Sequence, residues 1–435
     1  MMWERIKKIA YAIRHTRAVR ETAYVYAGSF ANGAALFLVS TLLAHTLDQK
    51  QFGIFSIAIL VLNTAAEISD FGLNAVLLRF VPHYHALGDE SKLKQLLKTV
   101  WQWRVRIAVV ATACGVFGAE LIATHILGQP ETAAVVRISS LGIGGVILLG
   151  FVSLYIQSSR QFIYAATLST LKGWGRLALV GLLVLCGVHH VPTIAIAYVI
   201  VPWILLVASM HRLPKGFLSI ETNQEFKKEL GEQLKHFSFW FTIWSFSSII
   251  ASRIDQAMIS HYLGLEAVAL YSIAYQPMIA YTMAQNAVGA VTTPRINGLK
   301  TREDVKLFIV RLWKWIIPAG VIVALLVYPS RLLIPLIFGS RYIDAMQLYV
   351  VLSYSMILSF IAAPLSVVVT WFNKAHLVAY GGFIQLVVNM GLNFVLIPRY
   401  GAMGAVTTFA LGICASAIYN AVCASILIRK KEVSL

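Results

Sequence analysis

The sequence predicts an all-α polytopic membrane protein with about twelve transmembrane helices. Of its 435 residues, 58% are hydrophobic and only 13% are charged, whereas a soluble domain carries about 25% charged residues. The apolar residues are gathered into long stretches that short polar breaks separate. A helix needs about 20 such residues to cross a bilayer, so this composition and patterning exclude a water-soluble globular fold.

Apolar windows between charged or turn-rich breaks place the expected helices in two sets of six. A polar linker at 213–236 separates an N-terminal lobe, 24–212, from a C-terminal lobe, 237–428. Short segments at 1–23 and 429–435 flank the two lobes. The expected helices are 24–47, 52–77, 103–127, 135–158, 162–187, 192–211, 237–262, 266–291, 308–328, 344–370, 376–397 and 401–428.

Basic residues fall mostly on one side of these helices. With the N-terminus inside, the inner segments hold 28 of the 36 Lys and Arg residues, Arg104 among them, and the outer segments hold five. Because cytoplasmic loops carry the excess of Lys and Arg, both termini are predicted to be cytoplasmic. Insertion and contact with anionic lipid then explain the net charge of +17, and no nucleic-acid partner is expected.

The two halves of the chain are similar to each other. Phe55-Ser-Ile-Ala, early in the second expected helix, matches Tyr271-Ser-Ile-Ala, early in the eighth. Arg160, in the turn after the fourth helix, aligns with Lys374, in the turn after the tenth. Because six is an even number, both halves start on the same side, as parallel repeats do in transporters. We therefore expect two six-helix lobes around a central cavity.

Motifs that would indicate catalysis are absent from the sequence. It contains no phosphate-binding loop, no H-E-x-x-H zinc motif and no G-x-S-x-G nucleophile motif. The four cysteines lie inside apolar stretches without a C-x-x-C pair, which argues against metal or disulfide chemistry. No enzymatic activity, cofactor or metal is expected, and transport is favoured by elimination. A membrane enzyme of glycan assembly is the alternative from another class.

Two basic residues lie deep inside one expected helix. Lys172 and Arg176 are four residues apart, hence on one helix face, at mid-membrane depth, where a charge normally faces a cavity or a partner. One interpretation is a cationic patch for a phosphorylated substrate, and the other is a structural ion pair with Glu67. Gly173 and Gly175 suggest a broken or cavity-lining segment at this point.

The remaining charges inside the expected helices are few. Glu67, Asp70 and Asp255 are candidate counter-ions, or sites that couple transport to protons or sodium. Arg253 lies two residues from Asp255, so the two do not pair along the helix, and structural pairing at the outer rim is the favoured interpretation of this arginine.

Amide side chains form a second group of candidates. They line a polar cavity for sugar hydroxyls or simply join helices by hydrogen bonds, and both interpretations stay open. On the eleventh helix they recur every four residues and so share one face. The candidates are Asn32, Gln276, Gln285, Asn286, Gln385, Asn389 and Asn393.

Longer segments resemble a known family. Arg253-Ile-Asp-Gln-Ala-Met-Ile-Ser and the following Tyr262–Ala274, together with Leu47–Ala58 and Asp70–Arg79 in the first half, are similar to the Wzx-type polysaccharide flippases. These belong to the multidrug/oligosaccharidyl-lipid/polysaccharide exporter superfamily. The second half departs from the pattern where Ala269 replaces the glycine that Gly53 supplies in the first.

The resemblance implies an activity, and the candidate residues can then be given roles in it. It implies an undecaprenyl-diphosphate-linked oligosaccharide, of O-antigen, capsule or exopolysaccharide type, that crosses the bacterial cytoplasmic membrane by alternating access. Lys172, Arg176 and Arg253 would then bind the diphosphate. Glycan polymerase and glycosyltransferases are the implied partners, and the oligomeric state is left open. A cation-coupled exporter of drugs or small molecules in the same superfamily is the alternative.

Overall fold

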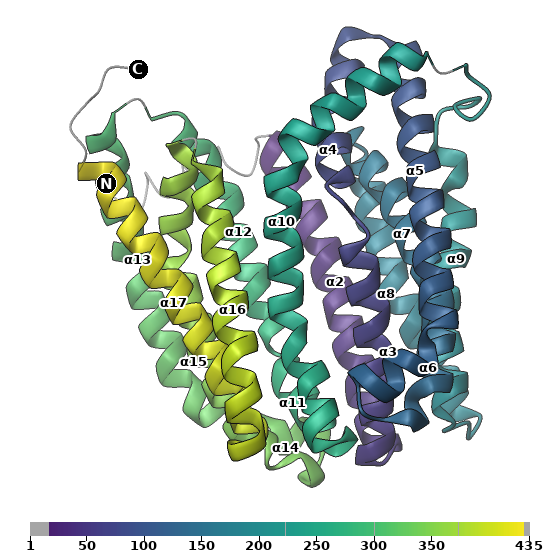
Figure 1. Ribbon diagram of the computed structural model, residues 1–435, viewed down its shortest axis with the longest axis vertical. Helices are drawn as coiled ribbons and strands as arrows, with labels where there is room; N and C mark the ends of the chain where they lie inside the picture. Colours follow the sequence, from purple (N-terminus) through teal and green to yellow (C-terminus); the bar gives the residue numbers. More distant parts are fainter. Residues whose placement is uncertain (1–16, 222, 300, 373, 430–435) are drawn as a thin grey trace. The chain divides into compact units, whose positions relative to one another are not determined.

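The computed structural model describes residues 17–221, 223–299, 301–372 and 374–429, and these ranges contain helices and no strands (Figure 1). Each of the twelve expected segments coincides with one helix or with consecutive helices joined by a short break, so the all-α polytopic fold is confirmed. The uninterrupted ones are α2 (Arg17–Thr46), α7 (Ala133–Ser158), α8 (Phe162–Leu185), α9 (Val191–Ser209), α10 (Gln224–Leu263), α13 (Arg302–Ser330), α15 (Ala345–Trp371), α16 (Ala375–Tyr400) and α17 (Ala402–Arg429).

Length and hydropathy alone identify fewer spans than twelve. Within the described residues, nine helices are long and apolar enough to cross a membrane, or ten if one bent pair counts as a single span. That pair is α5 (Glu90–Phe117) followed, after a bend of 59°, by α6 (Ala119–Leu121) and the π-helical turn η1 (Ile122–Ile126). Short elements complete the chain: η2 (Pro130–Thr132), η3 (Met210–Arg212), α14 (Leu333–Phe338) and η4 (Ser340–Tyr342).

The second segment of each half is broken, which differs from the continuous helices expected there. In the first half, α3 (Gln49–Ile68) ends and α4 (Leu73–Leu87) begins after Phe71 and Gly72, whose φ angles of 45° and 75° are left-handed. Asp70 stabilises the new start, because its Oδ1 accepts a hydrogen bond from the amide of Asn74 at 3.2 Å.

In the second half, the break lies between α11 (Leu265–Tyr275) and α12 (Met278–Asn297). Pro277 has no amide hydrogen to donate to the preceding turn, so it ends α11. Within the expected linker at 213–236, α10 already begins at Gln224, so the second part of this segment is helical and continuous with the seventh expected helix. The outermost ends of the chain, 1–16 and 430–435, lie outside the described residues.

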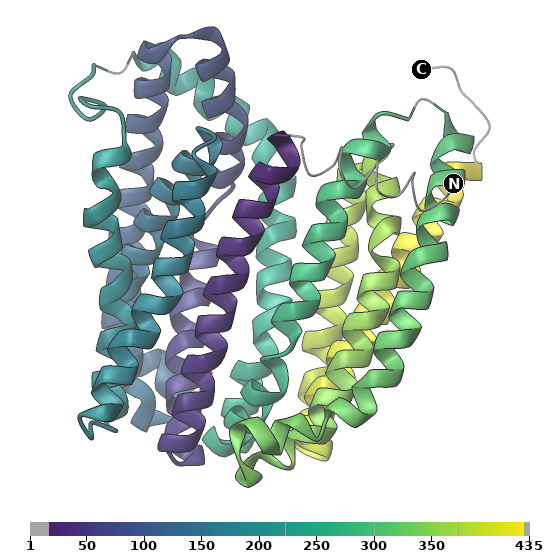
Figure 2. The same ribbon diagram turned by 180° about the vertical axis from the view of Figure 1, so that it is seen from behind.

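The chain forms two compact units. Unit 1 contains the described parts of 1–42, 65–119 and 134–238, and unit 2 contains 43–64, 120–133 and the described part of 239–435. In unit 1, α8 packs against α9 and α4 against α5. In unit 2, α15, α16 and α17 run side by side, as both views show (Figures 1 and 2). The lobe boundaries inferred from the sequence, 24–212 and 237–428, remain predictions.

Unit 2 joins helix ends from both halves of the sequence. Its two first-half pieces, 43–64 and 120–133, are held to the second half by side chains that bond backbone carbonyls, and each half supplies both donors and acceptors. These contacts are His45 Nε2 to Ile337 O at 2.8 Å, Arg341 Nη1 to Leu47 O at 2.8 Å, Gln129 Nε2 to Ser260 O at 3.0 Å and Ser260 Oγ to Leu127 O at 3.0 Å.

Gly53 allows α3 to touch α11 in this unit. A Cβ atom added to Gly53 would lie 2.1 Å from the carbonyl oxygen of Leu265. We therefore expect Gly53→Ala to lower the free energy of unfolding by about 1–3 kcal/mol, because the backbones must separate. Gly181, in α8, has open space where its Cβ would be, so Gly181→Ala should stabilise by up to about 1 kcal/mol. Thermal denaturation in detergent compares the two, and equal shifts would contradict the close approach.

Candidate functional site

A carboxylate is fully buried in unit 2. Asp255 lies on α10 and is 0% exposed. Its Oδ1 accepts a hydrogen bond from Asn393 Nδ2 at 2.7 Å. Its Oδ2 accepts hydrogen bonds from the Tyr271 hydroxyl at 3.2 Å and from Asn389 Nδ2 at 3.5 Å. All these partners are neutral, so within the described chain no cation offsets the charge of this carboxylate at hydrogen-bond range.

The spacing of the amides on α16 places them around Asp255. Asn389 and Asn393 are both 0% exposed, and Asn393 Nδ2 donates to Asn389 Oδ1 at 2.6 Å. The expected shared face is thereby confirmed for these two residues. Thr408 of α17 completes the cluster by donating its hydroxyl hydrogen to Asn393 Oδ1. Gly412 lets α17 approach α16, since a Cβ there would lie 3.2 Å from Gln385 O.

This cluster is rich in oxygen atoms that suit a cation. It brings together the Asp255 carboxylate, two amide oxygens and two hydroxyls, from residues that are at most 3% exposed. A buried carboxylate surrounded by neutral groups is unfavourable unless it takes up a proton or a cation. The cluster is therefore a candidate site for the uptake of a proton or a cation. Asp255, Asn389 and Asn393 were candidates from the sequence, whereas Tyr271 and Thr408 were not.

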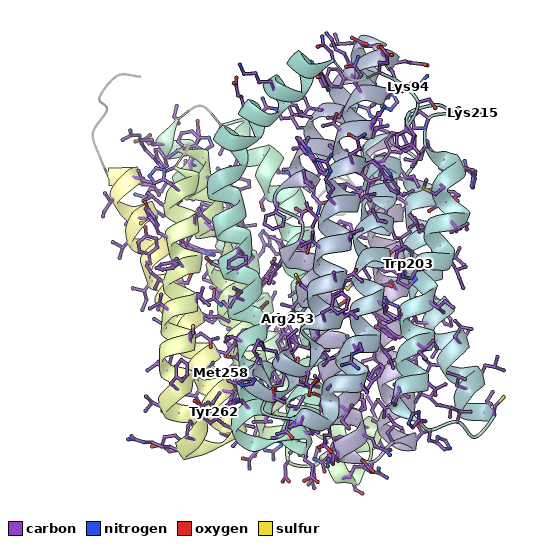
Figure 3. The ribbon with its side chains drawn as sticks, turned by 45° about the vertical axis from the view of Figure 1, so that its right-hand side comes forward. Lys94, Trp203, Lys215, Arg253, Met258 and Tyr262 are labelled. Carbon is purple, nitrogen blue, oxygen red and sulfur yellow. The ribbon has the colours of Figure 1, made fainter. Side chains whose placement is uncertain are left out.

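Arg253 lies on the same helix as this cluster. Figure 3 shows Arg253, Met258 and Tyr262 following one another along the part of α10 that leads to α11. Arg253 is half-buried, and it is not among the hydrogen-bond partners of Asp255 within the described chain. The expectation that these two residues do not pair is consistent with this geometry.

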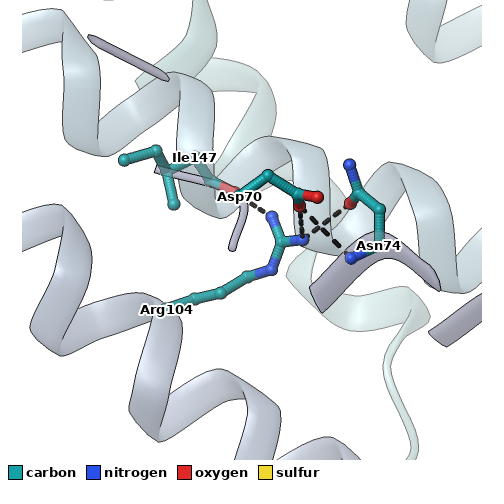
Figure 4. Close-up of polar contacts among 4 residues, drawn as sticks. All are labelled: Asp70, Asn74, Arg104 and Ile147. Atoms are coloured by element: carbon teal, nitrogen blue, oxygen red, sulfur yellow. Dashed lines mark hydrogen bonds and ion pairs between the residues drawn. The ribbon is translucent and has the colours of Figure 1, made fainter. Parts of the chain in front are cut away.

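A buried ion pair lies in unit 1, at the break between α3 and α4 (Figure 4). Arg104 of α5 is 4% exposed, and its Nη2 lies 3.0 Å from Asp70 Oδ1. The same nitrogen donates to Asn74 Oδ1 at 2.6 Å, and Nη1 donates to Ile147 O at 3.2 Å. Arg104 is therefore a buried helix residue that pairs with Asp70, and not the solvated loop charge that the sequence indicated.

Arg176 and Lys172 lie on α8 in the same unit. Arg176 is 4% exposed, and its guanidinium carbon lies 3.9 Å from the ring centroid of Tyr198 on α9. Its Nε has no hydrogen-bond partner among the described residues. Lys172, one turn earlier, is half-buried. The two cations are thus held inside a membrane-length helix, Arg176 against an aromatic face that stabilises it by a cation–π interaction.

The glycine near this pair serves packing rather than a break. α8 is continuous from Phe162 to Leu185, contrary to the expected broken segment. A Cβ at Gly173 would lie 2.9 Å from the backbone of Asn32, so the glycine lets α2 contact α8. The Asn32 side chain has a buried Oδ1 without a hydrogen-bond partner in the described chain.

The other candidates are distributed along their helices. Glu67 and Asn286 are exposed, at the end of α3 and in α12. Gln276 directly follows α11 at the break. Gln285, in α12, has a buried Nε2 without a hydrogen-bond partner in the described chain. None of these residues belongs to the hydrogen-bonded cluster around Asp255 or to the Asp70–Arg104 pair as far as the described contacts go.

Comparison with known proteins gives a family match and a consistent fold. The family described as "Polysaccharide biosynthesis protein" matches residues 18–300. An uncharacterised membrane protein of Methanocaldococcus jannaschii is 20% identical over 414 residues, 91% of this chain and 82% of its own. A Shigella flexneri protein with the provisional name of O-antigen transporter is 23% identical over 190 residues. That match spans 43% of this chain and 45% of the relative.

Two solved structures share the fold over nearly the whole chain. The lipid II flippase MurJ, in an inward closed conformation, has a TM-score of 0.73 at 15% identity, covering 92% of this chain and 86% of its own. An inward-facing multidrug resistance transporter of the MATE family has a TM-score of 0.74 at 13% identity, covering 94% of both chains. These likenesses show that the chain shares the all-α fold of these two structures over nearly its whole length.

Proposed function

This chain belongs to the polysaccharide biosynthesis protein family, and on that premise we propose that it is a flippase for a lipid-linked oligosaccharide. The substrate is an undecaprenyl-diphosphate-linked repeat unit, which moves from the inner to the outer leaflet of a bacterial cytoplasmic membrane by alternating access. The polyprenyl tail stays in lipid while the diphosphate and the sugars cross through the polar path.

One observation carries this proposal: α8 is long and apolar enough to cross a membrane and nevertheless holds Lys172 and Arg176. Cations at such depth are costly and normally serve a substrate or ion path. A diphosphate would supply the negative charge that this pair attracts, through charge-assisted hydrogen bonds strengthened by the low dielectric. Arg253, in unit 2, is a separate candidate for binding a phosphate group.

The Asp255 cluster is the proposed coupling site. A proton or a sodium ion that enters it neutralises the carboxylate, and its release restores an unfavourable buried charge. The difference in free energy between the two states can drive a conformational change of α10, α11, α16 and α17, which contribute the cluster. This assignment keeps Asp255 as a coupling residue. Asp70 is assigned to the ion pair with Arg104.

The second candidate function is a cation-coupled exporter of drugs or other small molecules. The resemblance of the fold to a multidrug resistance transporter favours it. Unpaired carboxylates along the path would favour cationic drugs, whereas the two cations of α8, Lys172 and Arg176, favour an anion. Export of a cationic dye by the reconstituted protein, unaffected by changes at Lys172 and Arg176, would support this second candidate over the first.

The orientation is part of the proposal. The excess of basic residues on one side of the helices supports a cytoplasmic location for both termini. Lys94, early in α5, and Lys215, in the segment after η3, lie at the same end of unit 1 (Figure 3), which is the proposed cytoplasmic side. Glycosyltransferases would then meet the substrate before translocation, and a glycan polymerase would meet it afterwards.

The test of the proposal replaces the two cations. Lys172→Ala and Arg176→Ala should each lower translocation of lipid-linked oligosaccharide in proteoliposomes by about tenfold or more, because each loses a charge-assisted contact to the diphosphate. Arg176→Lys should retain part of the activity, since the charge survives while the forked donor geometry is lost. Lys306→Ala, an exposed basic residue on α13, is the matched control.

Two outcomes decide between the interpretations of the pair. If Lys172 or Arg176 is a structural partner of Glu67, adding Glu67→Gln to the alanine variant should restore stability, and a double-mutant cycle measures this coupling. Full translocation by the Lys172→Ala/Arg176→Ala variant, at normal abundance, would eliminate the anion-binding role.

A further inference from the structure

A small pocket lies at one end of unit 1, where α4 meets the turn between α7 and α8. Its volume is about 230 Å³, and it is lined by Pro82, His85 and Ala86 of α4 and by Ser158, Ser159 and Arg160 of the turn. Pockets for drug-sized ligands measure about 300–1,000 Å³. This one is smaller, so it suits a compact head group and not an oligosaccharide.

Arg160 stands in this turn with an unusual backbone. Its φ of 60° is left-handed, and within the described chain Phe71 is the other non-glycine residue with a positive φ. Glycine or asparagine adopts this conformation more easily than arginine does. The equivalent basic residue of the second half, Lys374, has a φ of −107°. The turn therefore does not itself require arginine, and the guanidinium has no hydrogen bond or ion pair within the described residues.

Two serines and a histidine are among the residues that line the same pocket. Ser158 is 7% exposed, and its Oγ has no hydrogen-bond partner in the described part of the chain. Ser159 Oγ lies 3.2 Å from His85 Nε2. A buried hydroxyl that lacks a partner is unfavourable, so Ser158 is a donor in need of an acceptor. The acidic residue Glu90, at the start of α5, is not among the residues that line the pocket. Its carboxylate forms an ion pair with Lys94 at 3.4 Å.

The start of α8 adds to the positive potential. Its N-cap residue, Gln161, makes no side-chain capping hydrogen bond. The backbone N–H groups of the first turn therefore remain able to donate hydrogen bonds to a ligand. The N-terminal end of a helix favours an anion. An arginine, a histidine and two serines thus line one pocket at the proposed cytoplasmic side, and α8 begins two residues after Arg160.

We propose that this pocket binds a phosphate group. The guanidinium of Arg160 offers two parallel donors to phosphate oxygens, and Ser158 gains the acceptor that it lacks. The phosphate is carried either by the head group of an anionic phospholipid in the inner leaflet or by a soluble phosphate. The site is distinct from the Lys172–Arg176 pair, and it does not depend on the identity of the transported lipid.

The experiment uses the full-length chain in nanodiscs. In one arm, nanodiscs of phosphatidylcholine with or without phosphatidylglycerol are analysed by native mass spectrometry and thermal denaturation. In the other, inorganic phosphate is added to pure phosphatidylcholine nanodiscs. The variants are Arg160→Asn, which suits a left-handed backbone, and Ser158→Ala, which removes a hydroxyl without breaking a hydrogen bond. Lys215→Asn, an exposed position on the same side of unit 1, is the matched charge control.

We expect Arg160→Asn to lower retention of phosphatidylglycerol, or the stabilisation by inorganic phosphate, about tenfold, and Ser158→Ala about fivefold. Stabilisation in the phospholipid arm alone assigns the phosphate to lipid, and stabilisation in the phosphate arm assigns it to a soluble ligand. Equal losses for Arg160→Asn and Lys215→Asn would overturn the proposal, since they would reflect surface charge alone. Unchanged binding by a folded Ser158→Ala and by Arg160→Asn would overturn it as well.

Discussion

Asp255→Asn should abolish cation-driven transport while leaving a folded protein. The amide is isosteric with the carboxylate and keeps an oxygen for the hydrogen bond from Asn393, which lies at 2.7 Å. It removes the charge that a proton or sodium ion would neutralise. We expect gradient-driven transport to fall about a hundredfold, the loss that corresponds to about 3 kcal/mol of charge-assisted binding. Stability should be unchanged or raised, because an unfavourable buried charge disappears.

The measurement separates coupling from folding. Sodium or a lowered pH should raise the melting temperature of the unmodified protein by linkage, since a ligand that binds the folded state stabilises it, and the Asp255→Asn variant should lose this response. Asp344→Asn, at an exposed carboxylate before α15, is the matched control and should behave like the unmodified chain. Retention of both the melting response and full transport by Asp255→Asn would refute the coupling site.

Arg104→Ala should destabilise unit 1 more than any surface charge deletion. The change leaves the Asp70 carboxylate without the guanidinium that lies 3.0 Å away. Removing one partner of a buried pair costs about 3–5 kcal/mol. It also takes away the donor to Asn74 and to the carbonyl of Ile147, so the break between α3 and α4 loses its fixed geometry. We expect low abundance and an early melting transition.

A double-mutant series tests this pair. Asp70→Asn combined with Arg104→Gln should recover much of the lost stability, because no unpaired charge stays buried. Lys94→Ala removes a partner from the more exposed Lys94–Glu90 pair, in which the Glu90 side chain is 82% exposed, and should cost less than about 1 kcal/mol. If Arg104→Ala is no more destabilising than Lys94→Ala, the buried pair does not hold the break.

The pattern of apolar and polar residues in the sequence was sufficient to predict the fold class and one part of the candidate site. The length of the apolar stretches predicts the membrane helices, because a segment that crosses the bilayer must be long enough to span it and must satisfy its backbone hydrogen bonds within the helix. The four-residue spacing of Asn389 and Asn393 predicts their shared face, because the helical period of 3.6 is a local property. The break before α12 also has a local cause, Pro277, although the helix expected at 266–291 contained no break.

The partners across helices depended on the tertiary structure. Asp70 pairs with Arg104, 34 residues away, whereas the sequence indicated Asp70 only as a candidate counter-ion and did not identify its partner. Arg176 instead packs against the ring of Tyr198. Tyr271 and Thr408 add hydrogen bonds to the cluster around Asp255. Sequence period determines which residues share a face. The rotation of each helix about its axis, which decides what that face meets, follows from packing against neighbours that are distant in the chain.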